Sequence, residues 1–223
     1  ITFPEVLKNR GYITGKTGKG WAPGIAVKNG KKRDLIGQNY SSITTIPPAK
    51  FISNIDYFEN FKFFLEEIVK DQPFLFWVGG LEPHRRYQYR VGIEYGNKTI
   101  NEIKSVPNYW PDSENVRTDM LDYAFEIEYF DSHLVRIIKE LEIRDLLENT
   151  IIVVTSDNGM PFPRVKGQVY PDDNRLPLAI RWGGGIKNPG RVIDEYEAVS
   201  IIMSDASIRL SNEKNFFALS PSR

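Results

Sequence analysis

The chain has 223 residues, of which 41% are hydrophobic and 13% aromatic, so it can bury a sizeable core. Its 29 basic and 29 acidic residues cancel, which excludes the strong positive field typical of nucleic-acid-binding proteins. The sequence contains no cysteine, so disulfides, zinc–thiolate sites and a cysteine nucleophile are excluded within these residues. No run approaches the roughly 18 apolar residues of a membrane-spanning helix. We therefore expect a globular chain with no nucleic-acid partner and no membrane span.

The first half of the chain predicts two helices, two strands and a long loop. The helices are predicted over residues 3–10 and 57–70. The first strand is predicted to start at 12–14 and the second to span 74–78, and the loop covers 22–56. Thr2 suits an N-cap, and Gly11 suits the end of the first helix. The strand that starts at 12–14 is expected to run into a glycine-rich turn over 15–21.

The second half predicts one long helix followed by two strands. The helix is indicated by apolar residues at steps of three and four, namely Met120, Ala124, Ile127, Leu134, Ile138 and Leu141. Glu126 and Glu128 are expected on its solvated side, and His133 is expected to be structural or solvent-facing. Residues 87–114 are expected to be irregular, and the strands cover 151–155 and 178–182.

Strands that alternate with helices predict an α/β layered fold with a largely parallel sheet. Polar clusters directly follow the strands at 74–78 and 151–155. Folds of this class keep their sites at the carboxyl ends of the strands, so we expect the site there.

Two of these polar clusters could carry chemistry. Asp157 and Asn158 offer hard oxygen ligands that suit Ca²⁺ or Mg²⁺, although a simple turn after the strand explains them equally well. His84 suits a proton donor or an anion ligand, or it is an ordinary surface residue. A phosphate-binding loop at Lys16 is disfavoured, because that motif needs a glycine where Arg10 stands.

Four segments in order resemble the sulfatase family of the alkaline phosphatase superfamily. They are TFPEVLKNRGYITGKTGKGW, PFLFWVGGLEPHR, the run from 120 to 159 that ends in NTIIVVTSDNG, and PFPRVKGQVY followed by LPLAIRW. GKGWAPG, EPHR and SDNGMPFPRVK look most like the sulfamidase branch. The resemblance implies an alkaline-phosphatase-like layered fold with a mostly parallel sheet between helices. It further implies a partial catalytic domain over 1–203 and a tail of uncertain placement over 204–223.

The resemblance also implies a reaction. Sulfatases hydrolyse a sulfate ester or sulfamate, here on a sulfated saccharide such as N-sulfoglucosamine of heparan-type glycans. A formylglycine hydrate attacks sulfur, a divalent cation, usually Ca²⁺ with Mg²⁺ as the alternative, polarises the sulfate oxygens, and basic side chains hold the charge. Such enzymes are generally periplasmic, secreted or lysosomal.

By the same resemblance, five residues match the family's metal and sulfate sites. Asp157 and Asn158 match a pair of metal ligands. Lys19 matches the lysine that touches the nucleophile and the sulfate, and Lys166 matches a basic residue that contacts sulfate. His84 matches the histidine that binds sulfate or protonates the leaving group.

Two further residues, Arg85 and Arg164, are expected to meet neighbouring sulfates or carboxylates of the sugar, or to be surface residues. The chain departs from the family pattern at Trp21, where many sulfatases have histidine. The segment that carries formylglycine is expected before Ile1. The final residues 219–223 echo its signature, but Leu219 stands at the nucleophile position and cannot form formylglycine.

Two other functions remain open at this point. A metal-dependent phosphoesterase or phosphonate hydrolase would use the same residues, because charge and geometry at sulfur and phosphorus are similar. A non-catalytic, truncated relative would bind an anionic glycan or nothing.

With two metal ligands and no nucleophile, residues 1–223 expressed alone are expected to be inactive. An assay of sulfate release from an aryl sulfate, with and without Ca²⁺, checks this expectation. Measurable Ca²⁺-dependent release would contradict it.

Overall fold

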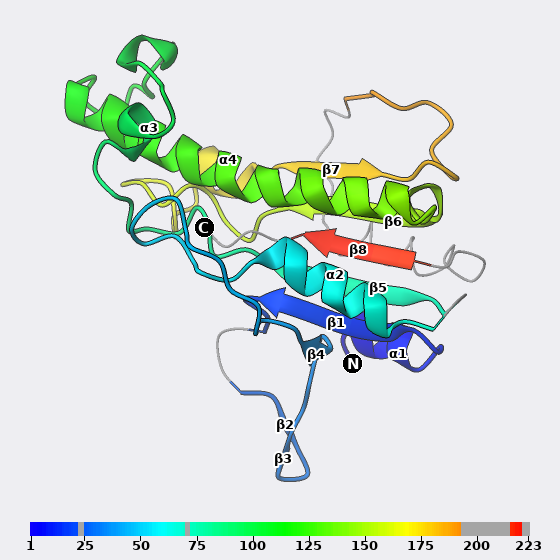
Figure 1. Ribbon diagram of the computed structural model, residues 1–223. Coiled ribbons are helices and arrows are strands. Elements are labelled where there is room, and N and C mark those ends of the chain that lie inside the picture. Colours follow the sequence, from blue (N-terminus) through cyan, green and yellow to red (C-terminus); the bar gives the residue numbers. More distant parts are fainter. Residues whose placement is uncertain (22–24, 70–71, 193–214, 220–223) are drawn as a thin grey trace.

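The computed structural model describes residues 1–21, 25–69 and 72–192, together with the backbone of 215–219 (Figure 1). The helices are α1 (Phe3–Lys8), α2 (Tyr57–Glu67), α3 (Val91–Glu94), α4 (Glu114–Ile143) and α5 (Pro171–Asn174), with short 3₁₀ turns η1 (Ile100–Glu102) and η2 (Leu147–Asn149). The strands are β1 (Ile13–Gly18), β2 (Val27–Lys28), β3 (Lys31–Lys32), β4 (Gln38–Asn39), β5 (Phe74–Gly79), β6 (Thr150–Thr155), β7 (Leu178–Arg181) and β8 (Asn215–Leu219). Within this part of the chain, no helix is both long enough and apolar enough to cross a bilayer.

One sheet organises the molecule, in the order β4-β1-β5-β8-β6-β7. Its neighbours pair in parallel except for β7, which is antiparallel to β6 at one edge. The predicted α/β class with a mostly parallel sheet is therefore confirmed. β8 lies within the predicted tail 204–223, while the serine-proline-serine-arginine end at 220–223 falls outside the described residues. The proposed boundary at residue 203 stays a prediction.

The glycine-rich turn expected over 15–21 is wrong in its first half, because β1 continues through Gly18. Gly15 pairs on one side with Gln38 and on the other with Phe76. A Cβ on Gly15 would lie 2.8 Å from the ring of Phe64, so the glycine serves close packing of a helix on the strand. Gly15 is therefore a packing residue within β1, and the turn begins only after Gly18.

Helices α2 and α4 lie side by side over one face of the sheet (Figure 1). Beneath them, aromatic rings of α2 and β5 form the main core, with the Phe64 and Phe76 centroids 4.6 Å apart. The alternate residues of β5 and β6 point to the opposite face, where Leu75 and Val153 pack with Leu7 of α1. Helices on both faces give the predicted layers.

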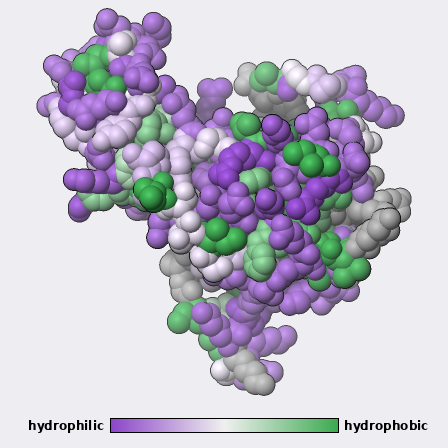
Figure 2. Space-filling model, viewed as in Figure 1, coloured by the Kyte–Doolittle hydropathy of each residue, from purple (hydrophilic) through white to green (hydrophobic). Residues whose placement is uncertain are grey.

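The outer surface of this helical layer is polar. On the face shown in Figure 2, hydrophilic residues dominate and hydrophobic residues lie in small, separate groups. This pattern is typical of amphipathic helices that bury only one side.

The buried side of α4 differs from the predicted one. Glu126 is only 1% exposed, whereas Ile127, which was expected in the core, is 40% exposed. The buried residues of α4 are Thr118, Leu121, Asp122, Glu126, Phe130, His133, Ile137 and Leu141. One polar residue of this stripe, Asp122, faces polar backbone: it accepts hydrogen bonds from the N–H groups of Arg90 and Gly92, each 2.9 Å long. The solvated placement of Glu126 was therefore wrong.

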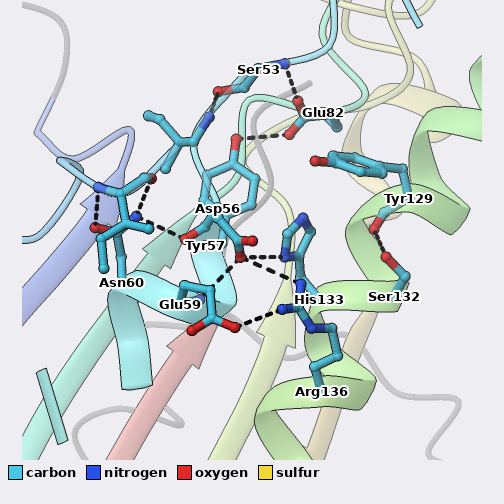
Figure 3. A network of polar contacts seen from close by, with 12 residues as sticks. Ser53, Asp56, Tyr57, Glu59, Asn60, Glu82, Tyr129, Ser132, His133 and Arg136 are labelled. Carbon is cyan, nitrogen blue, oxygen red and sulfur yellow. Dashed lines mark hydrogen bonds and ion pairs between the residues drawn. The ribbon is translucent and has the colours of Figure 1, made fainter. Parts of the chain in front are cut away.

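A polar network joins α2 to α4 (Figure 3). Asp56 caps α2 by accepting from the Glu59 N–H, and Arg136 of α4 pairs with Asp56 at 3.4 Å and Glu59 at 3.0 Å. His133 is 3% exposed, and its Nδ1 lies 3.6 Å from Asp56 Oδ1. His133 is thus a structural residue between the helices, one of the two roles predicted for it.

Burial moves the pKa values of two α4 side chains in opposite directions. It lowers the pKa of His133 to about 4, against the opposing effect of the Asp56 carboxylate. Burial, with the nearby Glu82 and Asp122 carboxylates, raises the pKa of Glu126 to about 9. Near pH 7 the helix therefore buries a neutral imidazole and a protonated carboxyl group.

The Glu126 shift predicts a pH-dependent gain from Glu126→Gln. In the unfolded chain Glu126 ionises near pH 4.5, whereas in the fold it stays protonated up to about pH 9. The native protein therefore loses stability as pH rises across that window, and a neutral glutamine removes the loss. We therefore expect the Tm of Glu126→Gln, relative to that of the native protein, to be a few degrees higher at pH 8.5 than at pH 5.

Thermal unfolding at both pH values checks this expectation. Glu128→Gln is the control, because the Glu128 carboxylate is exposed and pairs with Lys98 at the surface. A difference in Tm between Glu126→Gln and the native protein that is the same at both pH values would contradict the assignment.

Candidate functional site

The candidate site lies at the carboxyl end of the sheet. The parallel strands β1, β5 and β6 all end there, and each is followed by one of the predicted polar segments (Figure 1). Gly18 and Gly79, the last residues of β1 and β5, stand opposite each other in the ladder. This is the edge at which the sequence predicts the site.

Lys19 and Asp157 meet although 138 residues separate them. The Lys19 ammonium lies 3.0 Å from Asp157 Oδ2, and both side chains are about one-third exposed. Two strands, β5 and β8, lie between β1 and β6 in the sheet, so the two turns lean toward each other across their ends. The structure therefore brings together two of the residues that the sequence singled out.

A glycine makes the position of Lys19 attainable. The Lys19 N–H donates to the Gly79 carbonyl at 2.7 Å, which locks the turn after β1 onto the end of β5. A Cβ on Gly79 would lie 1.6 Å from the Lys19 carbonyl oxygen, a distance that no side chain tolerates. Gly79 is thus required by the close approach of two backbones.

The oxygens around Asp157 suit a hard cation. Asn158 Oδ1 is buried and has no hydrogen-bond partner among the described residues, and the same holds for Ser156 Oγ. An orphaned amide oxygen beside a carboxylate has the chemistry of a Ca²⁺ or Mg²⁺ ligand, so these residues fit such an ion. Among the described residues, however, no group of three or more His, Cys, Asp or Glu side chains could hold a metal. Asp157 and Asn158 would therefore supply only part of a coordination shell.

Glu82 anchors the loop that carries His84. Its carboxylate is 1% exposed and accepts hydrogen bonds from the Ser53 N–H at 2.7 Å and the Tyr57 hydroxyl at 2.8 Å (Figure 3). Burial raises the pKa of Glu82, and these donors act against that rise. The start of the loop is therefore tied to the core beneath α2.

His84 is exposed at the end of this anchored segment. Its Nδ1 lies 2.6 Å from the Arg85 carbonyl oxygen, which can only accept a hydrogen bond. Nδ1 therefore carries the proton, and Nε2 of the neutral ring keeps a lone pair for taking up a proton.

Arg85 ties the loop after β5 to two other segments. Its guanidinium donates to both carboxylate oxygens of Asp119 on α4, and its Nε donates to the Pro161 carbonyl at 2.7 Å. It also lies over the rings of Tyr87 and Phe162. The Asp119 hydrogen bonds raise the pKa of Arg85. Its predicted contact with the sugar stays a prediction, and the structure gives the guanidinium a loop-tying role.

Arg164 and Lys166 lie on a loop held by a buried residue between them. Val165 is 0% exposed and packs in a small cluster with Trp110 and Phe162, while Arg164 and Lys166 are exposed. The Trp110 indole N–H donates to the Pro163 carbonyl at 2.7 Å, which fixes the start of the loop. Because Val165 points into the core, the Arg164 and Lys166 side chains on either side of it are exposed to solvent.

Three acidic residues that support the site were missed from the sequence, namely Glu82, Asp119 and Asp173. Glu82 lay inside the quoted EPHR motif, so its place before Pro83 was the available signal. Asp119 gave no signal beyond its place near the start of α4. Asp173, whose carboxylate accepts hydrogen bonds from the Gly159 and Gly167 N–H groups, lies in α5, and Pro171 before two aspartates is a typical start of a helix.

Comparison with known proteins places this chain in a family. The Sulfatase family model matches residues 2–206. Human N-acetylglucosamine-6-sulfatase is 30% identical across 83% of this chain and 42% of its own length. Human N-sulphoglucosamine sulphohydrolase is 26% identical across 56% of this chain and 29% of its own length. An ulvan-active sulfatase of Formosa agariphila is 30% identical across 43% of this chain and 18% of its own length.

The chain thus spans less than half the length of each of these relatives. The family match, in contrast, covers most of the chain and includes the segments after β1, β5 and β6. The chain belongs to the sulfatase family.

Proposed function

We propose that the protein containing this chain hydrolyses a sulfate ester or sulfamate on a sugar, with the help of a divalent cation. The contact of Lys19 with Asp157 is the observation that carries the proposal. It joins a residue predicted to hold sulfate to a residue predicted to hold metal, at the edge of the sheet where sites of this fold class lie.

The basic residues of the site would hold the anionic group. A sulfuryl group carries negative charge on its oxygens throughout transfer, and preorganised cations lower the free energy of that charge in the transition state. Lys19 supplies one such cation on a turn fixed by backbone bonds to β5. Lys166 would supply a second from the loop that follows β6.

His84 would handle the proton of the leaving group. Because Nδ1–H is engaged with the Arg85 carbonyl, Nε2 is the atom that takes up and releases the proton. The protonated ring can donate from Nε2 to the departing oxygen or nitrogen of the sugar. Glu82 and Arg85 keep the histidine loop in place while this happens.

Asp157 and Asn158 would hold the cation, with the orphaned Asn158 Oδ1 as one ligand. When bound, Ca²⁺ or Mg²⁺ would polarise the sulfate oxygens. We further propose formylglycine as the source of the nucleophilic oxygen, from a residue outside 1–223, and export to the periplasm, the lysosome or the exterior. Both proposals rest on the family alone.

Amino sugars of glycosaminoglycans are the proposed substrates. The names of two relatives specify the N-sulfate of glucosamine and the 6-sulfate of N-acetylglucosamine. The motifs GKGWAPG and EPHR favour the N-sulfated sugar as the first to test.

The complete natural protein should release sulfate from N-sulfoglucosamine or N-acetylglucosamine 6-sulfate, and a chelator should stop the release. Because Lys19 would stabilise transition-state charge, we expect Lys19→Ala to lower kcat by about 10²–10³-fold. Sulfate release by ion chromatography is the measurement. Lys32→Ala in the exposed β2–β3 hairpin is the control, since it removes the same charge at a different place.

Two outcomes would contradict the proposal. Equal activity of Lys19→Ala and Lys32→Ala would remove Lys19 from the site. Hydrolysis of a phosphate monoester or phosphonate without any sulfate release would assign the protein to phosphorus chemistry instead.

A further inference from the structure

One carboxylate, that of Asp173, binds the backbone at two separate places in the candidate site. Asp173 lies in the single turn of α5 and accepts three hydrogen bonds from main-chain N–H groups. Its Oδ1 accepts from Gly159 at 3.0 Å, and its Oδ2 accepts from Gly167 at 3.0 Å and Gln168 at 3.1 Å. A carboxylate suits this task because it only accepts hydrogen bonds and has about four lone pairs for them.

The three amides lie directly beside the residues assigned above to the chemistry. Gly159 follows the pair Asp157–Asn158, and Gly167 follows Lys166. Fixing both glycines to one carboxylate therefore fixes the start of the loop after β6 relative to its far end. This tie bridges residues 160–166, which form no helix or strand.

The packing at Gly159 independently shows that the approach is tight. A Cβ on Gly159 would lie 2.5 Å from the Asp172 carbonyl oxygen and 2.5 Å from Asp173 Cα. Backbone therefore rests against backbone here, and only glycine leaves room for it.

Lys166 is held from its other side as well. Val165, which precedes it, is fully buried against Trp110 and Phe162. One neighbour of Lys166 is thus fixed by apolar packing and the other by the Asp173 carboxylate. The exposed Lys166 side chain starts from a backbone position with little freedom.

We propose that Asp173 is a positioning residue of the candidate site, which sets Lys166 relative to Asp157 and Asn158. The inference rests on the proposed function for the roles of those three residues, while the tie itself rests on the hydrogen bonds alone. Charge-assisted hydrogen bonds to backbone N–H groups are stronger than neutral ones, so a single carboxylate can hold the loop.

Asp173→Asn tests the tie with almost no change in shape. An asparagine has one acceptor oxygen, and its NH₂ group would face N–H donors on the other side, so it can serve Gly159 or the Gly167–Gln168 pair but not both. The matched control is Asp172→Asn, which removes the same charge one residue away. Asp172 bonds the Tyr109 hydroxyl and none of the three amides.

Two measurements on the complete protein decide the question. Hydrogen exchange by mass spectrometry should quicken in peptides that cover 159 and 167–168 in Asp173→Asn and stay unchanged in Asp172→Asn. On whichever sulfated amino sugar the native protein hydrolyses, kcat/KM should fall about 10–100-fold in Asp173→Asn, as for other residues that orient catalytic groups, and should fall less in Asp172→Asn. Asp173→Glu should recover part of the loss, because it restores an acceptor-only group.

The exchange measurement needs no activity, so it separates this inference from the proposed function. If the native protein hydrolyses no sulfate, the proposed function fails, and the exchange data still test the tie. Unchanged exchange in Asp173→Asn overturns the tie. Quicker exchange with a kcat/KM no lower than in Asp172→Asn overturns the positioning role. Where Asp173→Asn does not fold, Asp173→Glu decides: activity no better than background, with native exchange, contradicts the proposal.

Discussion

The parallel pairing of β1 with β5 is the constraint on which the candidate site depends. It brings Gly18 opposite Gly79, and the missing side chains allow Lys19 to bond the end of β5 directly. Lys19 is then directed along the carboxyl edge of the sheet toward Asp157. A larger residue at position 79 would clash with the Lys19 carbonyl oxygen and displace the turn that carries Lys19. The ion pair of Lys19 with Asp157 therefore depends on the close contact at Gly79, and that contact depends on the pairing of β1 with β5.

Beyond the strands, the site is built from loops, and charged groups with several hydrogen bonds replace regular structure in holding them. Glu82 fixes the histidine loop to the core, Arg85 fixes it to the loop after β6, and Asp173 closes that loop on itself. Each of these groups forms several hydrogen bonds to backbone or to side chains, so little of its hydrogen-bonding capacity is left unsatisfied. Such ties allow irregular backbone to present side chains as firmly as a strand does.

Local patterns predicted much of this fold, because apolar runs and helical periodicity are properties of neighbouring residues. The strands at 74–78 and 151–155 and the helix at 57–70 correspond closely to β5, β6 and α2. The predictions failed where a distant contact decided the outcome. Gly15 looked like a turn residue until the ring of Phe64 explained it, and Glu126 looked solvated until the burial of α4 against the Glu82 loop showed otherwise. The partner of Arg85 likewise depends on Asp119, 34 residues away, which no local pattern reveals.

The two shifted groups on α4 each cost stability, but their costs change with pH in opposite directions. Between about pH 4.5 and 6.5, unfolding releases a proton from Glu126 and takes one up on His133, so the summed cost of the two groups does not change with pH. Below that range His133 alone is opposed to the fold, because burying its charged form costs free energy. Above it Glu126 alone is opposed, because the unfolded chain gains by ionising. With respect to these two groups, stability is therefore highest in the mildly acidic range, where their pH dependences cancel.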